Sequence, residues 1–205
     1  MLPTSTPPPH TWAITGGIGS GKTTVCSLIR ELYTVPIFYC DDEAKHIIRT
    51  HPHVKAELTQ LIGPELYDAR GQLRKSVMAT YLTASTTQAS QVNAIVHPRV
   101  AEAWQAFCVN KPVAIMECAL LFESGFDHLV QHTIAVVCER EERIRRVMQR
   151  DHIERATVLR WLSLQWPDEQ VRAKAHHLID TTSGQREAHI AQIQAIFGKL
   201  PHQAQ

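Results

Sequence analysis

Apolar residues occur along the chain in two alternating patterns, short β-prone runs and longer stretches with helical spacing. Thr11–Thr15 is the first such run and ends at glycines. Residues 22–33 then carry apolar side chains at helical spacing, and residues 35–40 form a second β-prone run. These two periods predict a strand, a helix and a strand in turn. Together they make a βαβ unit, whose crossover we expect to be right-handed.

The rest of the chain predicts an α/β fold in which helices leave a parallel sheet twice. Residues 43–110 are mostly helical in pattern, with predicted interruptions at Gly63-Pro64, at the polar turn 68–71 and at His97-Pro98. Three further β-prone runs extend the sheet, at residues 112–117, 133–138 and 178–180. The remaining helical patterns are at residues 140–150, 154–176 and 185–197.

Composition narrows the class of protein and of partner. Of 205 residues, 44% are hydrophobic and 20% charged, as in a folded soluble protein. The net charge of +1 gives no global field for a nucleic acid or a membrane surface, so we expect neither as a partner. Residues 1–10 hold four prolines and no Lys or Arg, which favours a flexible tail over a secretory signal. The five widely spaced cysteines suit reduced thiols, and we expect a cytoplasmic protein.

The glycine-rich segment after the first strand fits the pattern G-x-x-x-x-G-K-[ST]. Glycines let successive backbone N–H groups converge on phosphate oxygens at the start of a helix. The candidate nucleotide contacts are Gly17, Ile18, Gly19, Ser20, Gly21, Lys22, Thr23 and Thr24. Lys22 should reach the β and γ phosphates, Thr23 should coordinate Mg²⁺ through its hydroxyl, and Thr24 should help to hold the α phosphate. The segment therefore predicts a P-loop that binds ATP and Mg²⁺.

Other features select among P-loop chemistries. A guanine-recognising Asn-Lys-x-Asp motif is not completed by Asn110-Lys-Pro-Val113, and the chain is too short for a large motor or transporter. Phosphoryl transfer needs a group that takes the proton of the acceptor hydroxyl, and Asp41 lies just past the predicted second strand. Asp41 or Asp42 could instead cap the helix that begins near Glu43.

A predicted basic helix, residues 140–150, carries three arginines on one face. Arg143, Arg146 and Arg150 are three or four residues apart, so helical geometry clusters their guanidinium groups. Such a stripe suits a triphosphate and could close over it as a lid, with Arg146 and Arg150 on the nucleotide. The alternative is a solvated face that pairs with Glu141 and Glu142.

These blocks, in this order, resemble the dephospho-coenzyme A kinase family over nearly the whole chain. The resemblance is carried by Thr15-Gly-Gly-Ile-Gly-Ser-Gly-Lys22, Tyr39-Cys-Asp41-Asp-Glu-Ala-Lys45, His97-Pro98, Ala119-Leu-Leu-Phe-Glu123, Gln149-Arg-Asp151 and the pair Arg160 and Gln165. The family's Asp-x-Asp falls here on Tyr39 or on Cys40 at its first position, so Asp42 is the fallback for Asp41. Ala119 replaces the usual Pro, and an Asn that often follows the last strand falls on Thr181 or Thr182.

The resemblance implies transfer of the ATP γ-phosphate to the 3′-hydroxyl of dephospho-CoA, the last step of coenzyme A biosynthesis. Asp41 would be the general base, with Lys22 and Arg146 stabilising charge. Thr15 would contact the phosphate side. The acceptor site would be lined by His97, Leu120, Leu121, Phe122 and Glu123.

The predicted fold is therefore a three-layer P-loop NTPase α/β fold with a parallel sheet, a helical acceptor-binding insertion and a helical lid. We expect a core at residues 11–42, 111–139 and 177–205, the insertion at 43–110 and the lid at 140–176. A monomer or a weak homo-oligomer is expected. Another nucleoside or metabolite kinase, or a nucleotide-binding regulator without turnover, stays open as an alternative.

Overall fold

The fold divides into two compact units. The computed structural model describes residues 10–198, so the tail predicted at 1–10 lies outside the described residues except for His10. One unit comprises residues 39–109, and the other comprises residues 10–38 together with 110–198. Among the described helices, none has both the length and the apolar character needed to cross a membrane.

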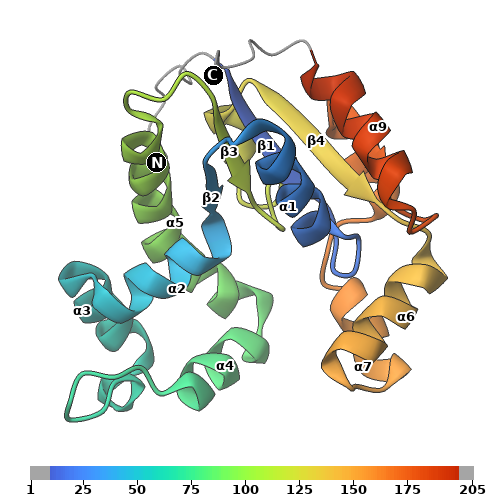
Figure 1. Cartoon of the computed structure of the whole chain (residues 1–205). Helices are drawn as coiled ribbons and strands as arrows, with labels where there is room; N and C mark the ends of the chain where they lie inside the picture. Colours follow the sequence, from blue (N-terminus) through green and yellow to red (C-terminus); the bar gives the residue numbers. More distant parts are fainter. Residues whose placement is uncertain (1–9, 199–205) are drawn as a thin grey trace. The chain divides into compact units, whose positions relative to one another are not determined.

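A five-stranded sheet lies at the centre of the larger unit (Figure 1). Its strand order is β2-β3-β1-β4-β5, and β1 pairs in parallel with β3 and with β4, as β4 does with β5. The strands are β1 (Thr11–Thr15), β2 (Ile37–Tyr39), β3 (Ala114–Glu117), β4 (His132–Val137) and β5 (His177–Asp180). All five predicted strands are confirmed, and all five residues of β1 are buried, as a central parallel strand requires.

Two helices pack beside one another on this sheet (Figure 1). They are α1 (Lys22–Tyr33) and α9 (Arg186–Phe197), and both were predicted from helical spacing. Val25, Leu28 and Ile29 of α1 meet Ile193 and Phe197 of α9 in the same buried cluster as the strand residues. The core of this unit is therefore formed where the apolar stripes of two helices cover the sheet.

The predicted lid segment forms three helices. These are α6 (Arg140–Asp151), α7 (Arg155–Leu162) and α8 (Asp168–Lys174), and a short 3-10 helix, η2 (Phe126–Leu129), precedes β4. Ile144 and Val147 of α6 pack on Val158 of α7 in a small core of their own. In addition, α8 packs against β4.

The second unit is helical, as predicted. Its elements are α2 (Cys40–Thr50), α3 (Pro52–Ile62), the 3-10 helix η1 (Pro64–Leu66), α4 (Lys75–Ala84) and α5 (Thr86–Cys108). Gly63, at φ 130°, ends α3 as expected. The turn at 68–71 is held by Asp68, whose Oδ1 accepts from the backbone N–H groups of Arg70 and Gln72.

The predicted interruption at His97-Pro98 is wrong, because α5 runs through it without a break. Proline removes one backbone donor from the helix, which costs stability but does not by itself end a helix. On either side of Pro98, Val96, Val100 and Trp104 are buried. Burial of this stripe keeps the two halves in one helix, an effect that local propensity does not contain.

Candidate active site

The glycine-rich segment forms a loop between β1 and α1, the context that a P-loop requires. Gly16, Gly19 and Gly21 adopt φ values of 142°, 77° and 91°, a region that side-chain-bearing residues rarely occupy. Gly21 is the N-cap of α1. The backbone therefore turns so that the first N–H groups of α1 open onto the loop, an arrangement that suits an anion.

Close packing is a second reason for glycine in this loop. A Cβ on Gly16 would lie 2.3 Å from the carbonyl oxygen of Val136 in β4. On Gly17 it would lie 2.0 Å from Nη2 of Arg143, and on Gly19 it would lie 2.7 Å from the carbonyl oxygen of Arg143. The loop is thus pressed between the end of β4 and helix α6, with no room for a side chain on that side.

Polar groups of the loop region divide into exposed and buried sets. Thr23 and Thr24 are exposed at the start of α1, and Lys22 Nζ donates to the carbonyl oxygen of Gly16 over 2.7 Å. Ser20 Oγ is buried without a hydrogen-bond partner among the residues described. Thr15 is buried, and its hydroxyl donates to the carbonyl oxygen of Ala119 over 3.4 Å. An ammonium group and exposed hydroxyls beside a glycine cradle fit a phosphate chain and its Mg²⁺.

The arginine stripe of α6 is divided among three environments. Arg143 is 4% exposed and bonded to Ile18 and Asp168. Arg146 is half-buried beside the loop, whereas Arg150 is exposed and pairs with the neighbouring Asp151. The predicted single cluster is wrong for Arg143, because its side chain is buried against Ile18 and Asp168.

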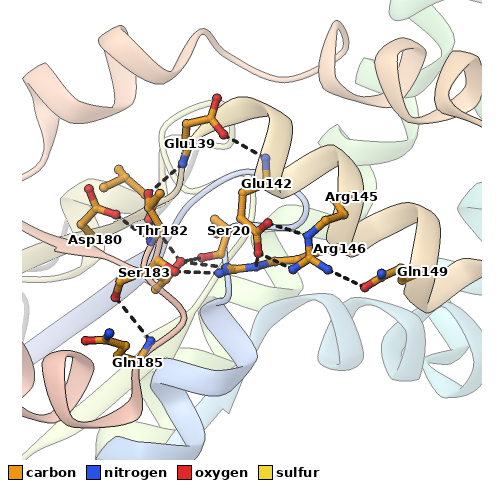
Figure 2. A network of polar contacts seen from close by, with 12 residues as sticks. Ser20, Glu139, Glu142, Arg145, Arg146, Gln149, Asp180, Thr182, Ser183 and Gln185 are labelled. Atoms are coloured by element: carbon orange, nitrogen blue, oxygen red, sulfur yellow. Dashed lines mark hydrogen bonds and ion pairs between the residues drawn. The ribbon is translucent and has the colours of Figure 1, made fainter.

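Arg146 joins α6 to the loop through Thr181, the residue after β5. Figure 2 shows Arg146 and Ser20 in this network of polar contacts. Nη1 and Nη2 of Arg146 donate to Oγ1 and to the carbonyl oxygen of Thr181, over 3.0 and 2.7 Å. Oγ1 of Thr181 donates in turn to the carbonyl oxygen of Ser20 over 2.7 Å. A Cβ on Gly21 would lie 3.5 Å from Nη1 of Arg146. A fixed cation therefore lies beside the phosphate loop.

Glu142 orients this cation. Its Oε1 accepts from Arg146 Nε over 2.8 Å and from Arg145 Nη2 over 2.6 Å. Hydrogen bonds from Arg145 and then from Arg146 lower the pKa of Glu142 to about 2. The carboxylate therefore stays charged. The alternative prediction, in which the basic face of this helix pairs with its acidic neighbours, is confirmed in part.

A dephospho-CoA kinase family model matches residues 11–187 of this chain. The chain belongs to the dephospho-CoA kinase family. A dephospho-CoA kinase of Bacteroides fragilis is 39% identical over 169 residues, which are 81% of this chain and 82% of the relative. A crystal structure of a Thermus thermophilus protein superposes with a TM-score of 0.80 at 29% identity, covering 94% of this chain and 98% of that one. A dephospho-CoA kinase of Campylobacter jejuni shares the fold, with a TM-score of 0.66 at 20% identity and 91% and 94% of the chains covered.

Two of the residues that the family resemblance assigns to the substrate lie in the helical unit. Asp41 is exposed in the first turn of α2, as is Asp42, which Lys45 contacts over 3.1 Å. The alternative in which either aspartate caps the helix is wrong, since α2 begins at Cys40 with Tyr39 as N-cap. His97 is half-buried in α5, and burial lowers its pKa, so a neutral imidazole is favoured.

The 119–123 block, which the dephospho-CoA kinase resemblance assigns to the acceptor, lies in the larger unit between β3 and η2. Leu120 and Glu123 are exposed, whereas Leu121 and Phe122 are buried. The Phe122 ring stacks on Trp166 with centroids 6.1 Å apart, and Oε1 of Glu123 accepts from the backbone N–H of Trp166 over 3.2 Å. The block is therefore attached to the segment between α7 and α8.

The sequence did not reveal the residues whose side chains hold other protein groups in place at this site. Thr181 was seen only as a substitute for an Asn, and Asp168 carried no signal at all. Gln165 stood in a family spacing without a role, yet its Oε1 accepts from the N–H of Ile18 over 2.8 Å. These contacts join residues more than 140 positions apart or pair α6 with α8, so only the spacing around Gln165 could have indicated one of them.

A buried thiol lies behind the loop. Burial raises the pKa of Cys26 in α1 to about 12, and the nearby carboxylate of Glu117 adds to the effect, while Lys22 opposes it. The thiol is thus neutral and unreactive at neutral pH. Cys26 is a packing residue of this kinase rather than a nucleophile.

Proposed function

We propose that this protein transfers the γ-phosphate of ATP to the 3′-hydroxyl of dephospho-CoA, the final step of coenzyme A biosynthesis. The observation that carries the proposal is the family match over residues 11–187, which spans the P-loop, both helical segments and all five strands. The loop geometry supports it, because the glycine cradle, Lys22 and Arg146 would together offer donors and positive charge to a nucleoside triphosphate.

For the nucleotide, we propose contacts from residues 17–24 together with Arg146 and Arg150. Backbone N–H groups would hold the phosphate oxygens, and Thr24 would contact the α phosphate. Thr23 would offer its hydroxyl to Mg²⁺, which when bound neutralises charge on the bridging phosphate oxygens. Lys22 and Arg146 would stabilise the charge that develops on the transferring group.

For the acceptor, we propose Asp41 as the general base that takes the proton of the ribose 3′-hydroxyl, with Asp42 as the alternative. Thr15, His97 and residues 120–123 would contact dephospho-CoA. The corresponding domain assignment is a core at 11–42, 111–139 and 177–205, an acceptor-binding domain at 43–110 and a lid at 140–176. The enzyme would act in the cytoplasm, as a monomer or a weak homo-oligomer, and its five buried free cysteines suit a reducing compartment.

A coupled spectroscopic assay tests the acceptor. Purified protein is given ATP, Mg²⁺ and one acceptor at a time: dephospho-CoA, a nucleoside, or another phosphorylatable metabolite. ADP release that depends on dephospho-CoA, with CoA identified as the product, supports the proposal. Turnover with the other acceptors but not with dephospho-CoA would overturn it. ATP binding without turnover on any of them would indicate a regulator instead.

The base is tested by two matched substitutions in one helical turn. Asp41→Asn should lower kcat by roughly 10²- to 10⁴-fold, the usual contribution of a general base, and should leave ADP affinity within about 2-fold. Asp42→Asn is the control and should keep most of the activity. The reverse pattern, with Asp42→Asn inactive, would transfer the role of base to Asp42. Full activity in both variants would contradict a carboxylate base in α2.

A further inference from the structure

One residue of the P-loop, Ile18, has both its backbone N–H and its backbone carbonyl oxygen bound by side chains from residues 140–176. Ile18 donates its N–H to Oε1 of Gln165 over 2.8 Å and accepts at its carbonyl oxygen from Nε of Arg143 over 2.9 Å. The two partners are 147 and 125 residues away along the chain. Both backbone polar atoms of Ile18 are thus held by side chains, although the loop itself has no regular secondary structure to hold them.

Arg143 is itself fixed by the first residue of α8. Its Nη1 lies 2.5 Å from each carboxylate oxygen of Asp168. The arginine side chain is 5% exposed and the aspartate 33% exposed. A buried guanidinium needs such a partner, because an unpaired charge at this depth is strongly unfavourable. Asp168 therefore decides where the guanidinium of Arg143 lies.

The same guanidinium lies directly against the loop backbone. A Cβ on Gly17 would lie 2.0 Å from Nη2 of Arg143 and 3.0 Å from Oε1 of Gln165. The carbonyl oxygen of Arg143 lies 2.7 Å from the corresponding position on Gly19. Arg143 and the loop therefore fit closely on both sides of Ile18, and a small shift of the guanidinium would displace the peptide groups that it touches.

We propose that Arg143, held by Asp168, is a positioning residue that sets the orientation of the Ile18–Gly19 peptide group and so prepares the P-loop for the phosphate chain. Arg143 acts through Ile18 rather than on the nucleotide, since its Nε and Nη1 serve protein acceptors and its side chain is only 5% exposed. Arg146, one turn later on α6, also bonds protein groups, but its side chain is 24% exposed and lies beside Gly21. The inference rests on the proposed function only in taking a nucleotide phosphate chain as the ligand of the loop.

The test replaces Arg143 and measures nucleotide binding apart from acceptor chemistry. For Arg143→Gln we expect the Kd for ADP by calorimetric titration and the KM for ATP to rise about 10-fold, on the scale of lost charge-assisted hydrogen bonds. The KM for dephospho-CoA should stay within about 2-fold. A residue that only stabilised the fold would lower Tm and leave the ADP affinity of the folded protein unchanged, which would overturn the proposal.

Asp168→Asn provides a second, milder route to the same result. It retains the arginine and removes the charge that fixes it, so ADP affinity should fall in the same direction by a smaller factor. The double variant should bind ADP no more weakly than Arg143→Gln alone, because Asp168 acts through Arg143. Independent, additive losses would contradict the proposed order of action. If Arg143→Gln does not fold, unchanged ADP affinity in Asp168→Asn would overturn the proposal.

Arg155→Gln is the matched control. Arg155 forms an exposed ion pair with Glu141 over 2.6 Å, and both residues lie within the 140–176 segment. The hydrogen bonds described for Arg155 go to Glu141 and not to the P-loop. The ADP affinity of Arg155→Gln should match that of the wild type, and an equal loss there would contradict a specific role for Arg143. The ADP titration needs no acceptor, so an inactive wild type towards dephospho-CoA would reject the proposed function and leave this test intact.

Discussion

The strands β1, β4 and β5 end in two very different environments. At their carboxyl ends, Thr181 links the P-loop to Arg146 through a chain of hydrogen bonds (Figure 2). At their amino ends lies a cluster of aromatic rings, in which Trp12 stacks on His132 with centroids 4.3 Å apart and lies 5.6 Å from His177. The same three strands therefore support a charged site at one edge and an aromatic cluster at the other.

The difference follows from the direction of the strands. In a parallel sheet all carboxyl ends lie at one edge, where following helices direct their N-terminal N–H groups toward a ligand. Gly21 at the start of α1 and Glu139 at the start of α6 are both at this edge. At the opposite edge the rings of Trp12, His132 and His177 pack on one another. We therefore expect changes at the carboxyl edge to alter activity and changes at the amino edge to alter stability.

In the comparison of the two edges, the largest expected effect is at the carboxyl edge, from Lys22→Ala. Loss of the ammonium group that lies over the loop should reduce kcat by about 10²- to 10³-fold, comparable with loss of an oxyanion donor. Steady-state kinetics with saturating ATP and dephospho-CoA measure it, and Tm serves as the control for folding. A rate constant equal to that of the wild type would contradict a role for Lys22 in charge stabilisation.

A smaller loss is expected from Arg146→Ala. Its bonds to Thr181 and Glu142 hold a cation beside the loop, and charge-assisted bonds of this kind are worth about 1.5–3 kcal/mol each. We expect kcat/KM for ATP to fall about 10- to 100-fold. Arg145→Ala is the control, since Arg145 is an exposed neighbour that pairs with the same Glu142. Equal losses in both variants would mean that kcat/KM depends on Glu142 rather than on the guanidinium of Arg146.

The smallest effect concerns the amino edge and appears in stability alone. Burial lowers the pKa of His132, and the neighbouring His176 and His10 add to the shift. The unfolded chain therefore binds this proton more readily than the folded one, so stability is retained above the unfolded pKa of about 6.5 and declines as the pH falls below it.

Chemical unfolding at pH values from 8 to 5.5 measures this decline. His132→Phe keeps a ring against Trp12 but cannot be protonated, so its stability should decline less with falling pH than that of the wild type. The kinetic constants of His132→Phe at pH 8 should equal those of the wild type. If the stability of the two proteins declines equally with falling pH, His132 is not the titrating group. A loss of kcat in His132→Phe would contradict the expectation that the amino edge affects stability alone.

The helical unit shows where local sequence patterns succeed and where they fail. Gly63 and the turn held by Asp68 were predicted because positive φ and short polar side chains are local requirements of the chain. Pro98 was misjudged because a long buried stripe on α5 offsets a local cost. The N-cap of α2 was also misassigned, since the helix begins directly at the end of β2 rather than after the two aspartates.

The sequence by itself determined the parallel α/β fold, the P-loop at residues 16–23 and the family, because these depend on periodicity and on fixed spacings within short segments. Only the tertiary structure decided which groups each arginine of α6 contacts. Arg143 and Arg146 lie on similar faces of one helix, yet the first meets Ile18 and Asp168 and the second meets Thr181. Those partners come from distant parts of the chain, and a pattern within one helix carries no information about which of them folding brings near.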